Sequence, residues 1–389
     1  MDGMMPNRSW AEVDLDRSGH NARRIRAITR RTAEVMGVVK ADAYGHGVSR
    51  VVPVLLENGV TRLAVSMLDE ALELRKQGID VPILVLGYTD PRRAEEIIAG
   101  GITQTVYSRD LATALSEAAG RLGREARIHI KIDTGMGRVG FLAGFEAVRD
   151  TLWIAQLPRL VIEGAYTHFA SADEEDPEYT LHQYARFTGV CAELDAGGVP
   201  IPIKHACNSP AILRFPSMHM DMVRAGLILY GMIPSPYCGE SRGLLPAMTL
   251  KSNVVLCKSL PPGSPVSYGR THVTSDRADI ATIPIGYADG YSRSLANRAQ
   301  VLLHGRRAPV VGRICMDMCM VDVSGLEHPV KVGDEVVLFG HQGEAQIPIE
   351  EMADWMGTIN YEVTCLIGRR VPRAYLSDGT VGNVTNYLL

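Results

Sequence analysis

The sequence predicts a mixed α/β protein in which a (β/α)8 barrel is followed by a smaller, mostly antiparallel β domain. In the first part of the chain, eight short apolar segments alternate with segments of helical period, and this alternation stops near residue 240. Eight parallel strands that alternate with helices close naturally into a barrel. Short strands bounded by turns are typical of an antiparallel domain. We place the barrel at residues 10–243 and the β domain at residues 244–389, with residues 1–9 packing against the β domain.

The barrel elements follow one another in a regular order. A short alternating strand is expected at residues 12–15 and a helix over residues 16–31. Helical spacing recurs between later strands, for example at residues 69–77, 91–99 and 110–122. These alternating patterns predict parallel βαβ units. The eight barrel strands are expected at residues 35–40, 62–67, 82–87, 102–107, 127–133, 160–168, 201–207 and 222–225.

Beyond residue 240 the predicted elements are short strands separated by turns. Pro261-Pro262-Gly263 and Val332-Gly333-Asp334 are two of the turn signals. One late helix is expected at residues 349–355. The strands are expected at residues 244–255, 266–268, 279–285, 300–303, 307–313, 318–323 and 335–339.

Composition narrows the class of protein. The chain has 389 residues, 46% of them hydrophobic, and a net charge of −4, so no basic footprint for nucleic acid is present. No apolar run is long enough to span a bilayer, and the N-terminal residues lack a signal-like apolar region. We therefore expect a soluble, cytoplasmic protein. Seven scattered cysteines are consistent with reduced thiols, and Cys315 and Cys319 have no second pair at zinc-like spacing, so no metal site is expected.

Polar residues that could carry chemistry stand where the predicted barrel strands end. Active sites of this fold lie at the carboxyl ends of the strands. Each of these residues alone has an ordinary explanation, such as a solvated charge, a hydrogen-bonded histidine or a helix cap. Their shared position on one face favours a functional site. They are Lys40, Asp133, Arg138, His168, Asn208, Ser209 and Arg224.

Two of these positions together suggest a cofactor. Lys40 follows a buried apolar strand, and it either reaches solvent before a glycine-rich turn or is held for chemistry. A desolvated lysine has a lowered pKa and can form a Schiff base with an aldehyde. After strands seven and eight, the Ser209 hydroxyl and the backbone amides of Gly226 and Leu227 would suit a phosphate monoester. A reactive lysine and a phosphate site on one barrel face suggest pyridoxal phosphate.

Nine motifs, spread in order over nearly the whole chain, carry a family resemblance. They are VVKADAYGHG at 38–47, KIDTGMGRVG at 131–140, THFASAD at 167–173, NSPA at 208–211, VRAGLILYG at 223–231, VSYG at 266–269, IPIGYADGY at 283–291, GRICMDM at 312–318 and TINYEV at 358–363. In these motifs the chain resembles the alanine racemases, pyridoxal-phosphate enzymes with a barrel followed by a β domain. The resemblance implies that the chain interconverts L- and D-alanine and supplies D-alanine for the cell wall.

The resemblance implies a role in cofactor binding for each matching barrel residue. Lys40 would carry pyridoxal phosphate as a Schiff base and act as one of two acid–base groups. Arg224 would face the pyridine nitrogen, while His168 would line the ring and contact Arg224. The remaining residues implied to hold the cofactor, mainly at its phosphate, are Tyr44, Asn208, Ser209, Gly226, Leu227 and Tyr361.

Other matching residues are implied to serve the substrate. Arg138 would bond the phenolic oxygen of the cofactor and help to hold the substrate carboxylate. Tyr268 would be the second base and would reach in from the other subunit of a homodimer, together with Met316 and Tyr287. Lys131 matches a position that is carbamylated in many relatives, and a carbamate there would orient Arg138.

Racemisation requires a proton to leave one face of Cα and another to arrive on the opposite face. Lysine and tyrosine have ordinary pKa values of about 10.4 and about 10, so both must be shifted to act near neutral pH. Arg224 would stay protonated and would discourage protonation of the ring nitrogen. The ring would then be a weaker electron sink than one that faces a carboxylate, which favours a racemase over a decarboxylase.

Several alternatives remain at this stage. A barrel-type decarboxylase would be expected to have a carboxylate in place of Arg224 and a Gly-Gly-Gly phosphate loop. A non-catalytic cofactor carrier would not need the β domain with Tyr268, and a purely structural barrel would make all nine motifs accidental. A serine or broad-specificity racemase is the nearest alternative. Tyr361 and Met316 would crowd the substrate side chain and favour alanine, although such a pocket discriminates a hydroxyl only modestly.

Overall fold

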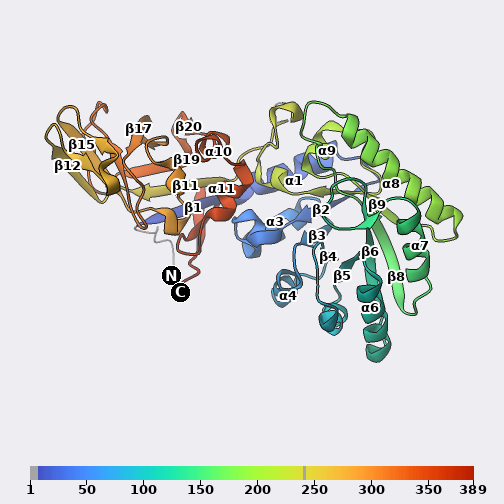
Figure 1. Cartoon of the computed structure of the whole chain (residues 1–389). Helices are drawn as coiled ribbons and strands as arrows, with labels where there is room; N and C mark the ends of the chain where they lie inside the picture. The colour runs from blue at the N-terminus through green and yellow to red at the C-terminus, as the bar shows by residue number, and fades with distance from the viewer. Residues whose placement is uncertain (1–7, 240–241) are drawn as a thin grey trace. The chain divides into compact units, whose positions relative to one another are not determined.

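The computed structural model describes residues 8–239 and 242–389, and the chain forms two compact units. The barrel unit contains residues 19–43 and 51–245, apart from residues 240–241. The β unit contains residues 8–18, 44–50 and 246–389. Residues 1–7, which the sequence predicts to pack against the β domain, lie outside the described residues. Figure 1 shows the elements of both units.

The barrel unit is built on eight parallel strands in the order β10-β2-β3-β4-β5-β6-β8-β9. Backbone hydrogen bonds from Asp221 N to Lys204 O, 3.1 Å, and from Arg224 N to Cys207 O, 3.0 Å, join the β9 and β10 ends, so the barrel is nearly closed. The predicted fold class is confirmed. The strands are β2 (Glu34–Val38), β3 (Arg62–Val65), β4 (Ile83–Val85), β5 (Thr103–Val106), β6 (Ala126–Asp133), β8 (Leu160–Tyr166), β9 (Ile203–His205) and β10 (Met222–Ala225), and β7 (Phe141–Leu142) pairs with β6 off this path.

Helices α4, α6, α7 and α8 lie outside the strands (Figure 1). The sequence of α6 shows why: Leu111, Leu115 and Ala119 recur at helical spacing and are buried. Ser108 caps its first turn by accepting a hydrogen bond from Leu111 N, and Gly123 ends it with φ 64°. The helices around the barrel are α1 (Leu15–Ile28), α3 (Val48–Glu57), α4 (Leu68–Lys76), α5 (Ala94–Ala99), α6 (Arg109–Leu122), α7 (Phe145–Ile154), α8 (Glu178–Ala196) and α9 (Ser209–Arg214).

The β unit contains an eleven-stranded sheet with the main order β12-β15-β18-β17-β16-β19-β11-β1-β21-β22, while β20 pairs with β19. All its pairs are antiparallel except β1 with β21. Its strands are β1 (Ser9–Asp14), β11 (Met248–Asn253), β12 (Leu256–Leu260), β15 (Ala278–Ile283), β16 (Gln300–Leu303), β17 (Arg306–Val311), β18 (Cys319–Asp322), β19 (Glu335–Gln342), β20 (Ala345–Ile347), β21 (Arg373–Ser377) and β22 (Thr380–Thr385). The unit also holds the hairpin of β13 (Pro265–Val266) and β14 (His272–Val273) and helices α10 (Ile349–Met356) and α11 (Asn360–Leu366).

Strand β1 belongs to this sheet, although the sequence places the barrel boundary at residue 10. Trp10, Ala11 and Val13 are all buried, so the strand is covered on both faces. It lies between β11 and β21, an inner position in the sheet.

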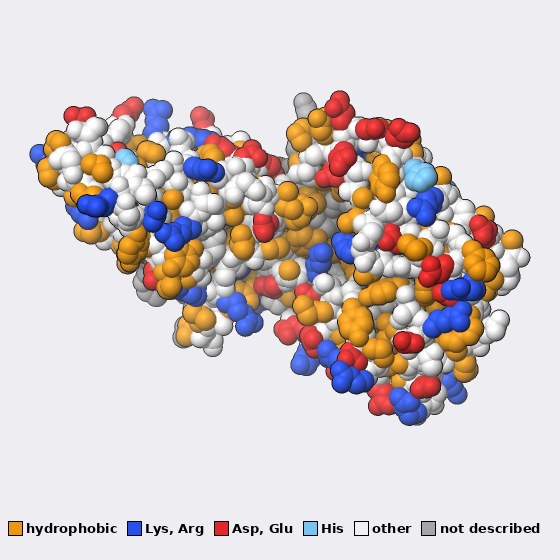
Figure 2. Space-filling view, in the orientation of Figure 1, with side chains coloured by type: hydrophobic (Ala, Val, Ile, Leu, Met, Phe, Trp, Pro, Cys, Tyr) orange, Lys and Arg blue, Asp and Glu red, His pale blue; other side chains and the backbone are white. Residues whose placement is uncertain are grey.

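The described residues contain neither a candidate membrane-spanning helix nor a candidate metal-ligand cluster. No helix in residues 8–239 and 242–389 is long and apolar enough to cross a bilayer. Within the same ranges, no three His, Cys, Asp or Glu side chains are grouped as metal ligands. None of the seven cysteines, which all lie in the described ranges, forms a disulfide bond. On the face drawn in Figure 2, basic and acidic side chains are interspersed, and no extended basic patch is visible.

Candidate active site

Lys40 begins a turn with an unusual backbone. Strand β2 ends at Val38, and Lys40 opens the short element α2 (Lys40–Tyr44), in which Ala41 has φ 53° and ψ 50°. Four consecutive non-glycine residues, 41–44, have φ between 53° and 55°. L-residues rarely adopt this left-handed conformation in succession, and strain of this kind is often found at functional sites. The expected strand-end lysine is thus the first residue of a left-handed turn.

The carboxylate of Glu70 in α4 anchors this turn to the barrel. It accepts hydrogen bonds from Ala41 N at 2.6 Å and, through its other oxygen, from Ser66 N at 2.7 Å. The backbone of β2 is held as well, because the Tyr230 hydroxyl donates to Val38 O at 3.1 Å. These contacts fix the chain on both sides of Lys40.

Positive charges converge on His168, two residues beyond the end of β8. Burial lowers the pKa of His168 well below its usual value, and the charges of Arg224, Arg138, Lys131 and Lys40 lower it further. Such effects require charges at short range. Of these groups, the Arg224 guanidinium lies 3.4 Å from His168 Nδ1, and the charges of Arg138, Lys131 and Lys40 act on the same imidazole.

Arg224 is a buried cation, with 3% of the residue exposed. Its guanidinium lies 3.0 Å from His205 Nδ1 and 3.4 Å from His168 Nδ1, and it donates to the carbonyl oxygens of Thr167 at 2.8 Å and Ala206 at 3.0 Å. Burial lowers its pKa to about 10. No ion pair found among the described residues 8–239 and 242–389 pairs Arg224 with a carboxylate. A buried cation without a carboxylate is positioned to meet a ligand.

Ser209 and Gly226 meet at the ends of β9 and β10, as the phosphate-site prediction requires. Gly226 N donates to Ser209 Oγ at 3.0 Å, and Leu227 begins the next short helix, which covers Leu227–Tyr230. Asn208 caps α9 by accepting from Ala211 N at 3.3 Å. Its amide nitrogen also donates to Phe169 O at 3.3 Å, which ties the cap to the segment after His168.

Lys131 is buried on β6, where burial disfavours the charged form of its amine. Its Nζ donates to the carbonyl of the next residue, Ile132, at 2.9 Å and lies 5.4 Å from the Tyr166 ring centroid. Burial lowers its pKa to about 7, and the charges of Arg224 and Arg138 act in the same direction. The neutral amine is therefore well populated near neutral pH.

The glycine-rich loop after β6 is ordered by Asp133. Its Oδ1 accepts from Gly135 N at 2.9 Å and from Gly137 N at 3.2 Å. Burial opposes ionisation of this carboxyl, yet these backbone hydrogen bonds hold its pKa below the usual value. The loop ends in the exposed Arg138.

The remaining predicted site residues lie in the β unit. Tyr44 and Tyr361 both belong to it. Burial raises the pKa of Tyr44 above its usual value, and the charges of Cys365 and Tyr361 raise it further. Tyr44 is the last residue of the left-handed turn.

Tyr268, Tyr287 and Met316 stand on neighbouring loops of the β unit. The hydroxyl of Ser267 donates to Arg313 O at 2.5 Å, and Tyr287 N donates to Cys315 O at 3.1 Å. These contacts bind the loops that carry the three residues to the single segment 313–316. All three side chains are exposed: 68% for Tyr268, 52% for Met316 and 43% for Tyr287.

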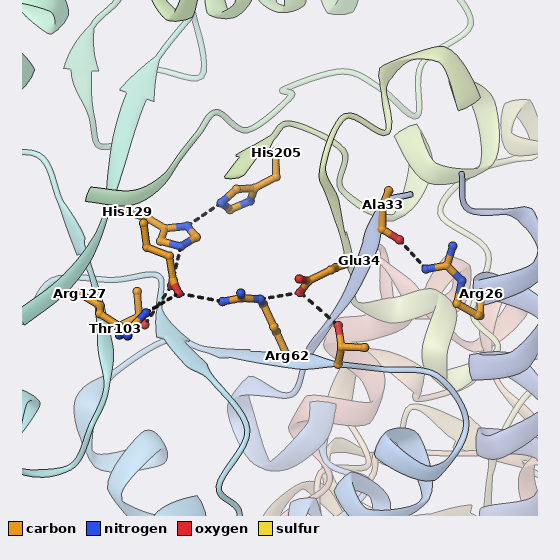
Figure 3. Close-up of polar contacts among 10 residues, drawn as sticks. Arg26, Ala33, Glu34, Arg62, Thr103, Arg127, His129 and His205 are labelled. Atoms are coloured by element: carbon orange, nitrogen blue, oxygen red, sulfur yellow. Dashed lines mark hydrogen bonds and ion pairs between the residues drawn. The ribbon is translucent and has the colours of Figure 1, made fainter. Parts of the chain in front are cut away.

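Three residues that hydrogen bonds connect in series to Arg224 were not among the predicted site residues. They are His205 on β9, His129 on β6 and Glu163 on β8 (Figure 3). A signal for one of them exists in the sequence: His129, Lys131 and Asp133 alternate within the apolar strand, so they share one face. Glu163 gives no comparable signal.

Comparison with known proteins decides the family. The model of the alanine racemase N-terminal domain matches residues 13–234, and that of the alanine racemase C-terminal domain matches residues 247–375. The chain belongs to the alanine racemase family. It is 48% identical to the alanine racemase of Clostridium tetani over 381 residues, covering 97% of this chain and 98% of that protein. Alanine racemases interconvert L- and D-alanine, so the chain is an isomerase.

Solved structures agree with this assignment. The alanine racemase of Clostridium difficile 630 superposes with a TM-score of 0.94 at 43% identity, covering 99% of this chain and all of that one. A structure of the same relative in complex with cycloserine has a TM-score of 0.93 at 42% identity, with 99% and 100% covered. The alanine racemases therefore share with this chain both the barrel and the β unit.

Proposed function

We propose that the chain racemises alanine with pyridoxal 5′-phosphate held by Lys40. The observation that carries the proposal is the group of four basic side chains, Arg224, Arg138, Lys131 and Lys40, that act on His168, because it suits a ligand with several anionic oxygens. When bound, pyridoxal phosphate stabilises the carbanion left by removal of the Cα proton. Its phosphate and phenolic oxygen, together with the substrate carboxylate, match the donors present, so the residues fit this cofactor.

The Ser209 hydroxyl, the amides of Gly226 and Leu227, and the side chain of Asn208 form the proposed barrel part of the phosphate site. The 3.0 Å hydrogen bond between Gly226 N and Ser209 Oγ supports this assignment, since it already joins two of the donors. We assign the hydroxyls of Tyr44 and Tyr361 to the same phosphate. The charge of Tyr361 raises the pKa of Tyr44, and this electrostatic coupling supports a shared target.

Arg224 is proposed to face the ring nitrogen, with His168 against the ring. A guanidinium stays protonated even when burial lowers its pKa to about 10. It therefore presents N–H donors to the ring nitrogen and leaves that nitrogen without a proton. With its nitrogen unprotonated, the bound ring would be a weaker electron sink, which suits racemisation better than decarboxylation.

Proton transfer is assigned to two groups on opposite faces of Cα. Lys40 Nζ takes or returns the proton on one face, and the Tyr268 hydroxyl of a partner subunit acts on the other. The two groups exchange roles when D-alanine is the substrate.

A homodimer follows from assigning Tyr268 to the partner's site. Tyr268, Tyr287 and Met316 expose large side chains on adjoining loops, which is typical of a surface that is covered in an assembly. Tyrosine and methionine are also enriched at protein interfaces. We propose that these three residues complete the substrate pocket of the neighbouring subunit.

Lys131 is proposed to be carbamylated. A neutral amine attacks carbon dioxide, an N–C bond forms and one proton is released, which leaves an anion on the side chain. The pKa of about 7 supplies that neutral amine. The resulting carbamate would neutralise nearby positive charge and hold Arg138, which would bind the substrate carboxylate.

Chiral product analysis with L-alanine and L-serine side by side tests the reaction. We expect D-alanine to form much faster than D-serine, and pyridoxal phosphate to be required. Predominant D-serine would favour a serine or broad-specificity racemase, whereas loss of carbon dioxide from the substrate would indicate a decarboxylase. Borohydride reduction followed by peptide mapping tests the cofactor, and a pyridoxyl group is expected on Lys40.

The relatives also suggest an inhibitor and a cellular role. Because the Clostridium difficile relative is described with cycloserine, inhibition by cycloserine that competes with alanine is expected here. We further propose that the enzyme acts in the cytoplasm and supplies D-alanine for the cell wall. Residues 10–243 would hold most of the cofactor, and residues 244–389 would supply Tyr361 and serve the partner subunit.

A further inference from the structure

A buried chain of hydrogen bonds leads from Arg224 across the interior of the barrel. His205 Nδ1 lies 3.0 Å from the Arg224 guanidinium, and His205 Nε2 lies 2.8 Å from His129 Nδ1. His129 Nε2 lies 3.2 Å from the Glu163 carboxylate. Figure 3 shows the two imidazoles pointing toward each other from β9 and β6. We call His205, His129 and Glu163 the buried hydrogen-bond chain.

The two ends of this chain fix the direction of every bond in it. A guanidinium can only donate, so His205 Nδ1 accepts and carries no proton. His205 must then be protonated at Nε2, and it donates to His129 Nδ1. His129 in turn is protonated at Nε2 and donates to Glu163. Both imidazoles are therefore neutral, and the His129–Glu163 contact is a hydrogen bond from a neutral ring rather than an ion pair.

The charges around the buried hydrogen-bond chain agree with donation that runs from Arg224 toward Glu163. Burial lowers the pKa of both imidazoles, and the nearby cations Arg224 and Arg62 lower both further. The pKa of Glu163 falls to about 2, first because His129 donates to it. Further contacts come from Arg62 at 3.3 Å, Arg127 at 3.4 Å and the Thr103 hydroxyl at 3.5 Å.

Beyond Glu163, the contacts continue to the amino ends of the strands. Arg62 also pairs with Glu34 at 2.5 Å, and Glu34 accepts from the Thr61 hydroxyl at 3.3 Å (Figure 3). Glu34 touches neither imidazole, so it is a natural comparison for Glu163. The side chain of Glu163 is 12% exposed and that of Glu34 is 41% exposed.

The backbone of β6 and β8 leaves room for the buried hydrogen-bond chain. The register between β6 and β8 shifts by one residue at this point. Ile128 pairs with Ile162, whereas His129 pairs with Gly164. Glu163 is therefore the extra residue of a β-bulge. Bulges re-aim side chains. A Cβ at Gly164 would lie only 2.7 Å from His129 Cε1, so a glycine leaves room for the ring. Tyr166 stacks on His205 with centroids 4.8 Å apart and planes at 13°.

We propose that His205, His129 and Glu163 are positioning residues that orient Arg224 and balance its charge from the far side of the barrel. Arg224 has no carboxylate of its own among the described residues, and Glu163 supplies the anion through two neutral rings. The inference rests on the proposed function in one respect, namely that Arg224 meets the cofactor ring nitrogen. Its consequence is that the donor offered to that nitrogen depends on Glu163.

The tautomers can be read directly in the wild-type protein. Histidine labelled with ¹⁵N distinguishes Nδ1 from Nε2 by NMR, and His129→Asn and His205→Asn spectra assign the signals. We expect both rings to be neutral and protonated at Nε2, with and without pyridoxal phosphate. A proton on Nδ1 of either ring, or a charged ring near neutral pH, overturns the proposal. Because the cofactor-free protein suffices, this result is separate from any failure of the proposed function.

Matched variants test the effect on Arg224 in the holoenzyme. Glu163→Gln keeps the shape and removes the charge, while Glu34→Gln removes a charge that also contacts Arg62. For Glu163→Gln we expect a shift in the pH midpoint at which the absorbance of the bound cofactor changes. We also expect kcat to fall by about tenfold with little change in KM. For Glu34→Gln neither should change by more than about twofold. Equal effects from the two variants overturn the proposal.

A graded pair at His129 covers the case in which Glu163→Gln does not fold. Asparagine at this position keeps an acceptor near the place of Nδ1, whereas leucine removes both hydrogen bonds. The proposal predicts that His129→Asn retains the His205 tautomer and most of the wild-type absorbance titration, and that His129→Leu loses both. Identical spectra for His129→Leu and the wild type would exclude a positioning role.

Discussion

Lys131 shows how one residue can be kept reactive by its surroundings. Lysine is rarely buried without a partner, yet this side chain is 2% exposed and contacts only a neighbouring carbonyl and the Tyr166 ring among the interactions identified. Burial and two nearby arginines lower its pKa to about 7. Since the neutral amine is the form that reacts with carbon dioxide, this environment supports the proposed carbamylation of Lys131.

Carbamylation of Lys131 should therefore increase with pH. The neutral fraction rises as the pH passes through about 7, so the carbamate should be scarce below pH 6 and abundant above pH 8 at fixed dissolved carbon dioxide. ¹³C NMR after equilibration with ¹³C-bicarbonate measures it. Lys131→Gln is the control and should lack the signal. A wild-type spectrum identical to that of Lys131→Gln would contradict the prediction.

Ser209 offers a second prediction at this scale. Ser209→Ala leaves Gly226 N without its acceptor and removes a donor to the phosphate, so the dissociation constant of pyridoxal phosphate should rise by about tenfold or more. Titration of the cofactor-free protein by absorbance measures this change. Ser116→Ala removes another buried hydroxyl, bonded to Pro158 O, and should lower stability by about 1 kcal/mol without changing cofactor affinity.

Among the elements, those with strong apolar patterns could be predicted and those with exposed surfaces could not. All eight barrel strands were expected within a few residues, because parallel strands buried on both faces are continuous apolar runs. Strands β12 and β22 were not expected, since LCKSL and TVGNVT are largely exposed and lack alternation. Helix α11 was missed because it has only seven residues, too few for a helical period to stand out.

The residues of the candidate site also fall into those that the sequence predicted and those that it did not. Lys40, His168 and Arg224 were found because they follow strand ends, where the fold places function. His205 and Glu163 were not found, because their contact with the site depends on cross-strand register and on a bulge that local sequence does not encode. The left-handed turn after Lys40 is likewise a product of tertiary contacts such as those of Glu70.

The glycine after this turn gives a prediction at the scale of elements. Gly45 has φ +80°, and a Cβ there would collide with the backbone oxygen of Thr364. Gly45→Ala should lower stability by more than about 2 kcal/mol and weaken cofactor binding. Gly120 lies exposed in α6 with open space around it, so Gly120→Ala should raise stability by about 0.5–1 kcal/mol. Thermal unfolding of both variants is the measurement, and similar midpoints would contradict this account.

At the scale of the whole molecule, the two proposed bases differ in their surroundings. Lys40 stands among the cations that surround His168, while Tyr268 is 68% exposed on a loop of the β unit. A tyrosine that waits for a partner would be exposed in the single chain. The account therefore requires that each active site draw Lys40 from one subunit and Tyr268 from the other.

Hybrid dimers of Lys40→Ala and Tyr268→Phe subunits test this requirement most directly. Each variant alone should be nearly inactive. In a random equimolar mixture about half of the dimers are hybrids, and each hybrid has one intact site of two, so about one quarter of wild-type activity should return. The same mixture made with a Lys40→Ala, Tyr268→Phe double variant in place of Tyr268→Phe should stay inactive. If subunits exchange and the mixture of single variants is no more active than its parts, the two bases do not come from different subunits.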